Sequence, residues 1–326
     1  MRRLSQAGFK KDFVRPAILP DWWDETDAEQ PDLLPEIEIR VARFLGVPLA
    51  AVRDPALVLA PTQYVNAQLR RVRDVDRDRL APAIHSALRI GAAVVRSLRE
   101  AAPSPQPLPA DALLWRQQLQ PGGSPVALDQ VLADLWTKGI PVVPLDVLPA
   151  PSFQGIACIV EGRPVILLGH RHDEPGRTAF LIAHEAGHIA AGDCLPDQPV
   201  VDKEDEVLDD SDIEHRANRY ATRALVGGDE PPAVEATSFR QLANRAAHLE
   251  RTTGADAGFI IFAWAARTGD YAKATMAVQA LYRGRGARRQ LRQHFDQHVD
   301  LEAANESDRA LLRCVFGDPE RNETPR

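Results

Sequence analysis

Cysteine is scarce in this chain, with three residues in 326. So few thiols, and an odd number of them, argue against a disulfide framework and indicate a reducing compartment. Long apolar runs are missing too: no stretch of 18 apolar residues occurs, and the opening MRRLSQAGFKKDF lacks the apolar segment that a secretory signal needs. We therefore expect a soluble, cytoplasmic protein that makes no contact with a membrane.

An excess of positive charge is absent as well. The chain has 39 basic and 46 acidic residues and a net charge of −7, which argues against a protein that binds nucleic acid over its whole surface. The densest basic cluster runs from Arg283 to Arg292 and contains five arginines. This cluster either binds phosphate groups or forms the solvated start of a helix.

Proline, by contrast, is abundant, with 26 residues. Four prolines alternate with other residues in 101–111, a spacing that is incompatible with a helix and favours an extended linker. We expect this linker to follow a helical N-terminal domain, 1–100. A second domain is expected over 112–230, and a helical C-terminal domain, without strand alternation, over 231–326.

The N-terminal hundred residues contain a degenerate helix-turn-helix pattern. Apolar residues recur at helical spacing in 35–52, and Ala42 and Gly46 occupy the positions where two helices would cross around a turn. Pro55 cuts the second helix short, and the face of that helix offers one cation and one anion instead of the basic and amide side chains that read DNA bases. We expect a packing domain, with DNA binding as the alternative.

The apolar periodicity changes after the linker and predicts an α+β fold. Strand-like and helical patterns alternate here, and a short turn between two β-rich runs predicts a hairpin. In the helix expected over 173–192, Asp173 is the candidate N-cap, and Gly192 is the expected end. The expected elements are a helix over 128–140, a strand over 141–147, a hairpin of 155–160 with 164–169, and helices over 173–192, 211–226 and within about 237–318.

The helix over 173–192 contains an HExxH motif, in which Glu185 follows His184 and precedes His188. Residues four apart lie on one face of a helix, so both imidazoles can bind one metal ion, for which zinc is the usual choice. Glu185 can then accept a proton from a water molecule at the metal. Apolar flanking residues indicate that the helix is buried, where such polar groups need a partner that offsets their desolvation. The alternative is a pair of hydrogen-bonded core histidines.

Two histidines leave a catalytic zinc site one protein ligand short. Downstream carboxylates are plentiful, but most fall in the acidic run 201–212, which has the composition of a solvated loop. Glu214 differs because it begins an apolar helix and shares a face with Asn218. The same residue also completes a capping box with Ser211, so spacing alone leaves two roles for Glu214, metal ligand and helix cap.

The two motifs together resemble the ImmA/IrrE family of bacterial zinc metallopeptidases. The first is FLIAHEAGHIAAGD, and the second, E-x-x-A-N-x-x-A, begins at Glu214, about 26 residues after His188. The resemblance covers roughly 112–230. It implies a zincin-like metallopeptidase domain, in which a small twisted sheet lies beside the HExxH helix, flanked by mostly helical segments.

The resemblance also assigns roles to individual residues. It implies that His184, His188 and Glu214 bind Zn²⁺ and that Glu185 is the catalytic base. Asn218 would contact a metal ligand, and not the metal itself, and so keep that ligand oriented. The chain departs from the family's pattern at position 216, where an arginine replaces an acid, so any role of that acid is absent here.

The function implied by the resemblance is a zinc-dependent endopeptidase. Its expected substrate is a partner protein, a helix-turn-helix transcriptional repressor, whose cleavage would derepress a stress, mobile-element or phage-defence operon. Single-stranded DNA is a candidate trigger, with Arg283–Arg292 as the place to look. A substrate peptide is expected to add as an extended strand to 155–160 or 164–169.

The alternative function is a zinc-containing regulatory binding module, such as an anti-repressor or a toxin–antitoxin component, without efficient turnover. Glu185 argues against this alternative, because a purely structural zinc site has no need of a base.

Overall fold

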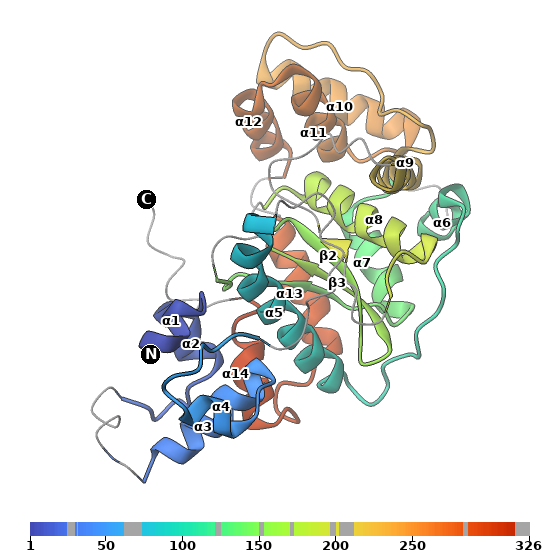
Figure 1. The fold of residues 1–326 in the computed structure, drawn as a ribbon. Coiled ribbons are helices and arrows are strands. Elements are labelled where there is room, and N and C mark those ends of the chain that lie inside the picture. Colours follow the sequence, from blue (N-terminus) through green and yellow to red (C-terminus); the bar gives the residue numbers. More distant parts are fainter. Residues whose placement is uncertain are drawn as a thin grey trace.

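The fold is known from a computed structural model, and its described part is mostly helical with one four-stranded sheet (Figure 1). This arrangement confirms the expected α+β class. No helix in the described part is both long and apolar enough to cross a membrane. The residues described are 1–24, 30, 32–61, 74–120, 125–149, 153–169, 173–195, 200–201, 212–282 and 286–316.

The four strands form a mixed sheet in the order β1-β3-β2-β4. β1 runs parallel to β3, whereas β2 runs antiparallel to both β3 and β4. The predicted hairpin is β2–β3, and it turns at Glu161 and Gly162, whose φ angles of 53° and 75° suit a tight two-residue turn. The strands are β1 (Val142–Pro144), β2 (Gly155–Val160), β3 (Arg163–Leu168) and β4 (Val200–Val201).

Helices cover both faces of the sheet. On one face lies α5 (Asp74–Arg96), whose Gly91 comes so close that a Cβ there would lie 3.2 Å from the side chain of Leu167. On the other face lies α8 (Pro175–Ala191), which meets β2 at Gly155. Side chains alternate along a strand, so each face of β2 packs against a different helix. The HExxH helix is thereby fixed against the centre of the fold.

The ends of α8 follow the sequence prediction with one exception. Pro175 occupies the first turn, and Gly192 ends the helix in the left-handed conformation with a φ of 72°. The N-cap position, however, belongs to Glu174, and the prediction of Asp173 was wrong. The Asp173 carboxylate instead accepts a hydrogen bond of 2.7 Å from the backbone N–H of Arg288, so a tertiary contact replaces the local one.

Helix α9 (Asp212–Val226) crosses α8 at close range. The contact centres on Gly187, where a Cβ would lie 3.2 Å from both the Cα of Ala217 and the Cβ of Tyr220. A larger residue than glycine at this point would push the two helices apart. The close approach brings the beginning of α9 beside the HExxH motif.

The N-terminal segment contains the expected turn between two helices. α3 (Leu34–Leu45) ends at Gly46, which has a φ of 68°, and the five-residue α4 (Leu49–Arg53) follows. No residue of α4 is buried. The second helix is therefore short, as Pro55 predicts. A packing role for this segment stays the prediction, with DNA binding as the alternative. Two short helices precede the pair: α1 (Arg2–Gln6) and α2 (Lys11–Ala17).

The main hydrophobic core draws on the N-terminal helices, the sheet, α8, α9 and the last helices of the chain. A second, smaller cluster joins α10, α11 and α12, which lie together at one end of the molecule (Figure 1). The predicted domain boundaries stay predictions. The remaining helices are α6 (Ala112–Leu119), α7 (Leu128–Thr137), α10 (Phe239–Thr253), α11 (Ala257–Thr268), α12 (Tyr271–Tyr282), α13 (Ala287–His298) and α14 (Glu306–Leu312).

Part of the basic cluster Arg283–Arg292 is used to hold the C-terminal helices in place. Arg288 forms an ion pair with Asp146, and the guanidinium of Arg292 lies 4.2 Å from the centre of the Phe316 ring. Positions 283–285 lie outside the described residues. Binding of phosphate or single-stranded DNA by this cluster is therefore still only an expectation.

His85 connects α5 to α3 through a buried contact. The residue is 1% exposed, its Nε2 atom lies 2.6 Å from the carbonyl oxygen of Phe44, and its ring packs edge-on against the Phe44 ring. Burial disfavours the charged imidazolium and lowers the pKa of His85 to about 4, although the hydrogen bond to Phe44 acts in the opposite direction.

We expect acid to weaken this contact. The folded-state pKa of His85 is below its ordinary value of 6.5, so the unfolded chain takes up the proton first and stability is lost as the pH falls from 6.5 toward about 4. Between pH 7 and pH 4.5, the free energy of unfolding from urea titrations should fall by about 2 kcal/mol more in the wild type than in His85→Gln. Equal losses in the two proteins would contradict this assignment.

Candidate metal centre

Three buried side chains from two helices converge on one point. They are His184 and His188 of α8 and Glu214 of α9, and one ligand atom of each lies within 4.8 Å of the others. The two Nε2 atoms are 3.1 Å apart, and the Glu214 carboxylate comes within 3.2 Å of His184 Nε2 and 3.6 Å of His188 Nε2. Their exposed fractions are 5%, 0% and 8%. The structure therefore brings together all three residues that the sequence analysis named as metal ligands.

The carboxylate of Glu214 points at the imidazoles because of the way α9 crosses α8. Ala217, one turn further along α9, packs against Gly187 between the two histidines, so the first turn of α9 faces them. The competing role for Glu214 was a capping box with Ser211. Ser211 lies outside the described residues.

The rear nitrogen of each imidazole contacts an oxygen atom. His184 Nδ1 lies 2.9 Å from Asn218 Oδ1, and His188 Nδ1 lies 3.1 Å from Asp193 Oδ2. An amide oxygen and a carboxylate oxygen both accept hydrogen bonds, so in each neutral ring Nδ1 carries the proton and Nε2 carries a lone pair. Both lone pairs then point into the cluster.

These donor atoms fit a zinc ion. Two imidazole lone pairs and a carboxylate are three electron-pair donors that converge in a buried space, an arrangement that a cation satisfies. Zinc binds nitrogen and oxygen at about 2.0–2.2 Å with tetrahedral angles, which places neighbouring ligand atoms about 3.3 Å apart. His184 Nε2 lies close to that distance from His188 Nε2, at 3.1 Å, and from Glu214 Oε2, at 3.2 Å. The 3.6 Å contact of His188 Nε2 is with the other oxygen, Oε1.

The electrostatics of the cluster also favour a cation. Burial opposes the charged form of His188, but hydrogen bonds with Asp193 and Glu214 outweigh it and raise the pKa of His188 to about 9. Burial likewise opposes the charged form of Glu214, yet hydrogen bonds with His184 and His188 hold the pKa of Glu214 well below its ordinary range. Nearby carboxylates stabilise the positive charge of His188, and the two imidazoles stabilise the negative charge of Glu214.

Glu185 lies on the sheet side of α8 and is fully buried. Its carboxylate is packed so tightly against β2 that a Cβ at Gly155 would lie 2.1 Å from Glu185 Oε1. Only glycine leaves room for the carboxylate at this point of the strand. The candidate base is thus held beside His184 by the sheet, on a different side of the helix from Glu214.

Two residues near the cluster were not recognised from the sequence as partners. The sequence marks Asp193 only as one of the plentiful carboxylates downstream of the HExxH motif, and Arg216 only as a departure from the family's pattern. In the structure Asp193 contacts His188, and Arg216 Nη2 donates to both oxygens of Asp193, at 2.7 and 3.0 Å. The sequence feature that could have identified Asp193 as a partner of His188 is its position directly after Gly192, the residue that ends α8.

The expected place for a substrate strand needs correction. β3 lies between β1 and β2, and β2 lies between β3 and β4, so neither strand of the hairpin is an edge of the sheet. The two-residue β4 pairs with Ile156 and Ala157 of β2. A peptide strand therefore cannot add to β2 where β4 is already paired, at Ile156 and Ala157.

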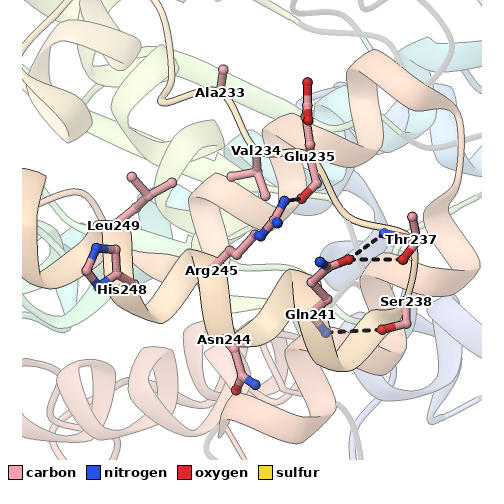
Figure 2. A pocket seen from close by; sticks show the side chains of 10 residues that line it. All are labelled: Ala233, Val234, Glu235, Thr237, Ser238, Gln241, Asn244, Arg245, His248 and Leu249. Atoms are coloured by element: carbon pink, nitrogen blue, oxygen red, sulfur yellow. Dashed lines mark hydrogen bonds between the residues drawn. The ribbon is translucent and has the colours of Figure 1, made fainter.

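A separate cavity of about 820 Å³ lies on α10 and the segment before it (Figure 2). Internal hydrogen bonds occupy several of its polar groups: Arg245 donates to the Glu235 carbonyl, and Gln241 accepts from Thr237. None of its lining residues belongs to the histidine–glutamate cluster. The cavity is therefore not part of the candidate metal centre.

No family model, no curated protein and no solved structure matches the chain. The case for a metal centre accordingly rests on the geometry of these residues and on the resemblance of the two motifs.

We expect the protein to bind one zinc ion per chain. His188→Ala and Glu214→Gln should each lower zinc affinity by at least about 100-fold, because the first removes a ligand atom and the second replaces a charged carboxylate with a neutral amide. The matched control is His215→Ala, which alters an exposed histidine next to Glu214 and should leave zinc affinity unchanged. Elemental analysis and competition with a chelator measure both quantities. Stoichiometric, tight zinc in His188→Ala would contradict the assignment.

Proposed function

We propose that the chain is a zinc-dependent endopeptidase that cleaves a partner protein. The observation that carries the proposal is a cluster of two histidines and one glutamate with a second, separate glutamate beside it. Three protein ligands with an adjacent base are the components of a catalytic zinc site, whereas a structural site has four protein ligands and needs no base.

In this proposal His184, His188 and Glu214 hold the zinc ion. A zinc ion bound there would supply Lewis-acid activation of a water molecule and of the peptide carbonyl. Asn218 and Asp193 keep the two rings oriented through their Nδ1 atoms. Ring orientation matters, because a rotated imidazole no longer presents its Nε2 lone pair.

Glu185 is proposed to move the proton. Its carboxylate accepts a proton from the attacking water and then donates it to the nitrogen of the leaving amine, so the residue is regenerated in each cycle. Packing against Gly155 prevents the carboxylate from rotating away. Full burial of the side chain also excludes bulk water, which strengthens its electrostatic interactions.

An aromatic surface next to His184 supports a peptide substrate. Phe180 lies one turn before His184 on α8, with their ring centres 6.4 Å apart, and it packs against Phe262 of α11 at 6.0 Å. Both phenylalanines are only half-buried. They offer a contact for an apolar side chain of the substrate near the cleaved bond.

The identity of the substrate is proposed from the resemblance alone. On that basis the substrate is a helix-turn-helix repressor, and its cleavage derepresses a stress, mobile-element or phage-defence operon. Single-stranded DNA is the proposed trigger. Capture of the repressor without cleavage would instead favour the regulatory binding module.

Glu185→Gln is the variant that separates hydrolysis from binding. The amide cannot accept the proton, so cleavage of the proposed repressor substrate should slow by about 10²–10⁴-fold, while zinc content stays at the wild-type value. Gel electrophoresis and mass spectrometry of the products measure the cleavage. Undiminished cleavage by this variant would contradict the role of Glu185.

Gly155→Ala tests the same role through the backbone. The new methyl group would overlap the Glu185 carboxylate and force it to move, so we expect loss of cleavage with all three zinc ligands unaltered. Gly228→Ala is the control, because a methyl group there has only one neighbour, at 3.9 Å. Cleavage and zinc content are measured for both variants. Wild-type cleavage rates in Gly155→Ala would show that the placement of Glu185 is unimportant.

A further inference from the structure

A half-exposed arginine is connected to the candidate metal centre through one carboxylate. Arg216 of α9 donates from Nη2 to both oxygens of Asp193, at 2.7 and 3.0 Å. One of those oxygens, Oδ2, lies 3.1 Å from Nδ1 of His188. The three residues thus form a continuous chain of hydrogen bonds from the surface of one helix to a ligand on another.

Asp193 is fixed at both its backbone and its side chain. Its N–H donates to the carbonyl of His188 at 3.0 Å, in the turn where Gly192 ends α8. Its carboxylate then turns back to the imidazole of the same histidine. Because this contact is with Nδ1, and the cluster gathers around Nε2, Asp193 supports the ring from behind and is not a fourth ligand.

Arg216 lies two residues after Glu214 on α9. Helix α9 therefore carries Glu214, which is a candidate ligand. It also carries Arg216, which holds the carboxylate that contacts His188. Any movement of α9 relative to α8 would change both at once. The contact between Arg216 and Asp193 links the two helices at the point where their relative position decides the distances between the ligand atoms.

An ordinary surface ion pair is the competing explanation, and such pairs contribute little. The Arg216–Asp193 pair differs from an ordinary surface pair in its burial, since the side chain of Asp193 is 11% exposed whereas that of Arg216 is 45% exposed. A comparison lies on the same helix: Arg223 pairs with Asp229, and these side chains are 37% and 61% exposed. Of these two pairs, the first has the carboxylate that is largely shielded from solvent, and that carboxylate contacts His188.

We propose that Arg216 is a positioning residue for the metal centre. It holds the Asp193 carboxylate against His188, which keeps the proton on Nδ1 and the Nε2 lone pair directed at the zinc ion. The inference rests on the proposed zinc site and adds to it a residue that touches neither the metal nor the substrate. The positioning role also assigns a function to the arginine at position 216, where the family's pattern has an acid.

Zinc affinity of the full-length protein, measured by competition with a chelator, tests the inference without any substrate. Arg216→Ala should weaken zinc binding by about 10–100-fold. Arg216→Lys keeps one donor and should lose less. Arg223→Ala is the matched control and should bind zinc as the wild type does. Thermal unfolding in the presence of a chelator shows whether the metal-free variants remain folded.

A double variant separates positioning from a general structural effect. If Arg216 acts through Asp193, the variant that combines Arg216→Ala with Asp193→Asn should bind zinc no more weakly than Asp193→Asn alone. Additive losses, or wild-type affinity in Arg216→Ala, would overturn the inference. Loss of folding in Arg216→Ala and in Arg216→Lys would overturn it as well, because the residue would then be structural.

The experiments distinguish a failure of the Arg216 inference from a failure of the proposed function. A wild-type protein that binds no zinc would remove both the function and the inference. A wild-type protein that binds zinc but cleaves nothing would contradict the peptidase, while weaker zinc binding in Arg216→Ala would still establish the positioning role.

Discussion

The close crossing of α8 and α9 at Gly187 is the constraint on which the candidate metal centre depends. Because glycine at this point lets the helices approach, the carboxylate of Glu214 reaches the two imidazoles of α8. The result is three electron-pair donors in a buried space. Such a cluster is costly without a positive charge, and a metal ion supplies that charge more completely than a single proton does.

The rest of the fold makes that crossing rigid. α8 is fixed by β2 on its Glu185 side, by α9 on its histidine side and by α11 near Phe180. Sites on regular elements keep their geometry better than sites on loops. The loop residue that matters, Asp193, is itself immobilised by the helix end at Gly192 and by Arg216. The proposed chemistry is therefore supported at both histidine ligands by a second contact.

Local sequence signals predicted much of this arrangement. The HExxH helix, its end at Gly192 and the β2–β3 hairpin all follow from residues close together in the chain. Spacing left Glu214 as either a metal ligand or a helix cap, and the resemblance of the motifs implied the ligand. The direction of its carboxylate depends on the crossing of two helices. What failed depended on distant contacts: Asp173 serves α13 instead of capping α8, and the two-residue β4, too short to predict, turns β2 into an inner strand. Arg216 and Asp193 are 23 residues apart, and no periodicity connects them.

The central claim is that one zinc ion is bound by two imidazoles and a carboxylate. X-ray absorption at the zinc edge, on protein purified without chelators, tests it most directly. The account predicts one zinc per chain with nitrogen and oxygen neighbours at about 2.0–2.1 Å and the scattering signature of two imidazole rings. Sulfur neighbours at about 2.3 Å, or a protein without stoichiometric metal, would contradict it.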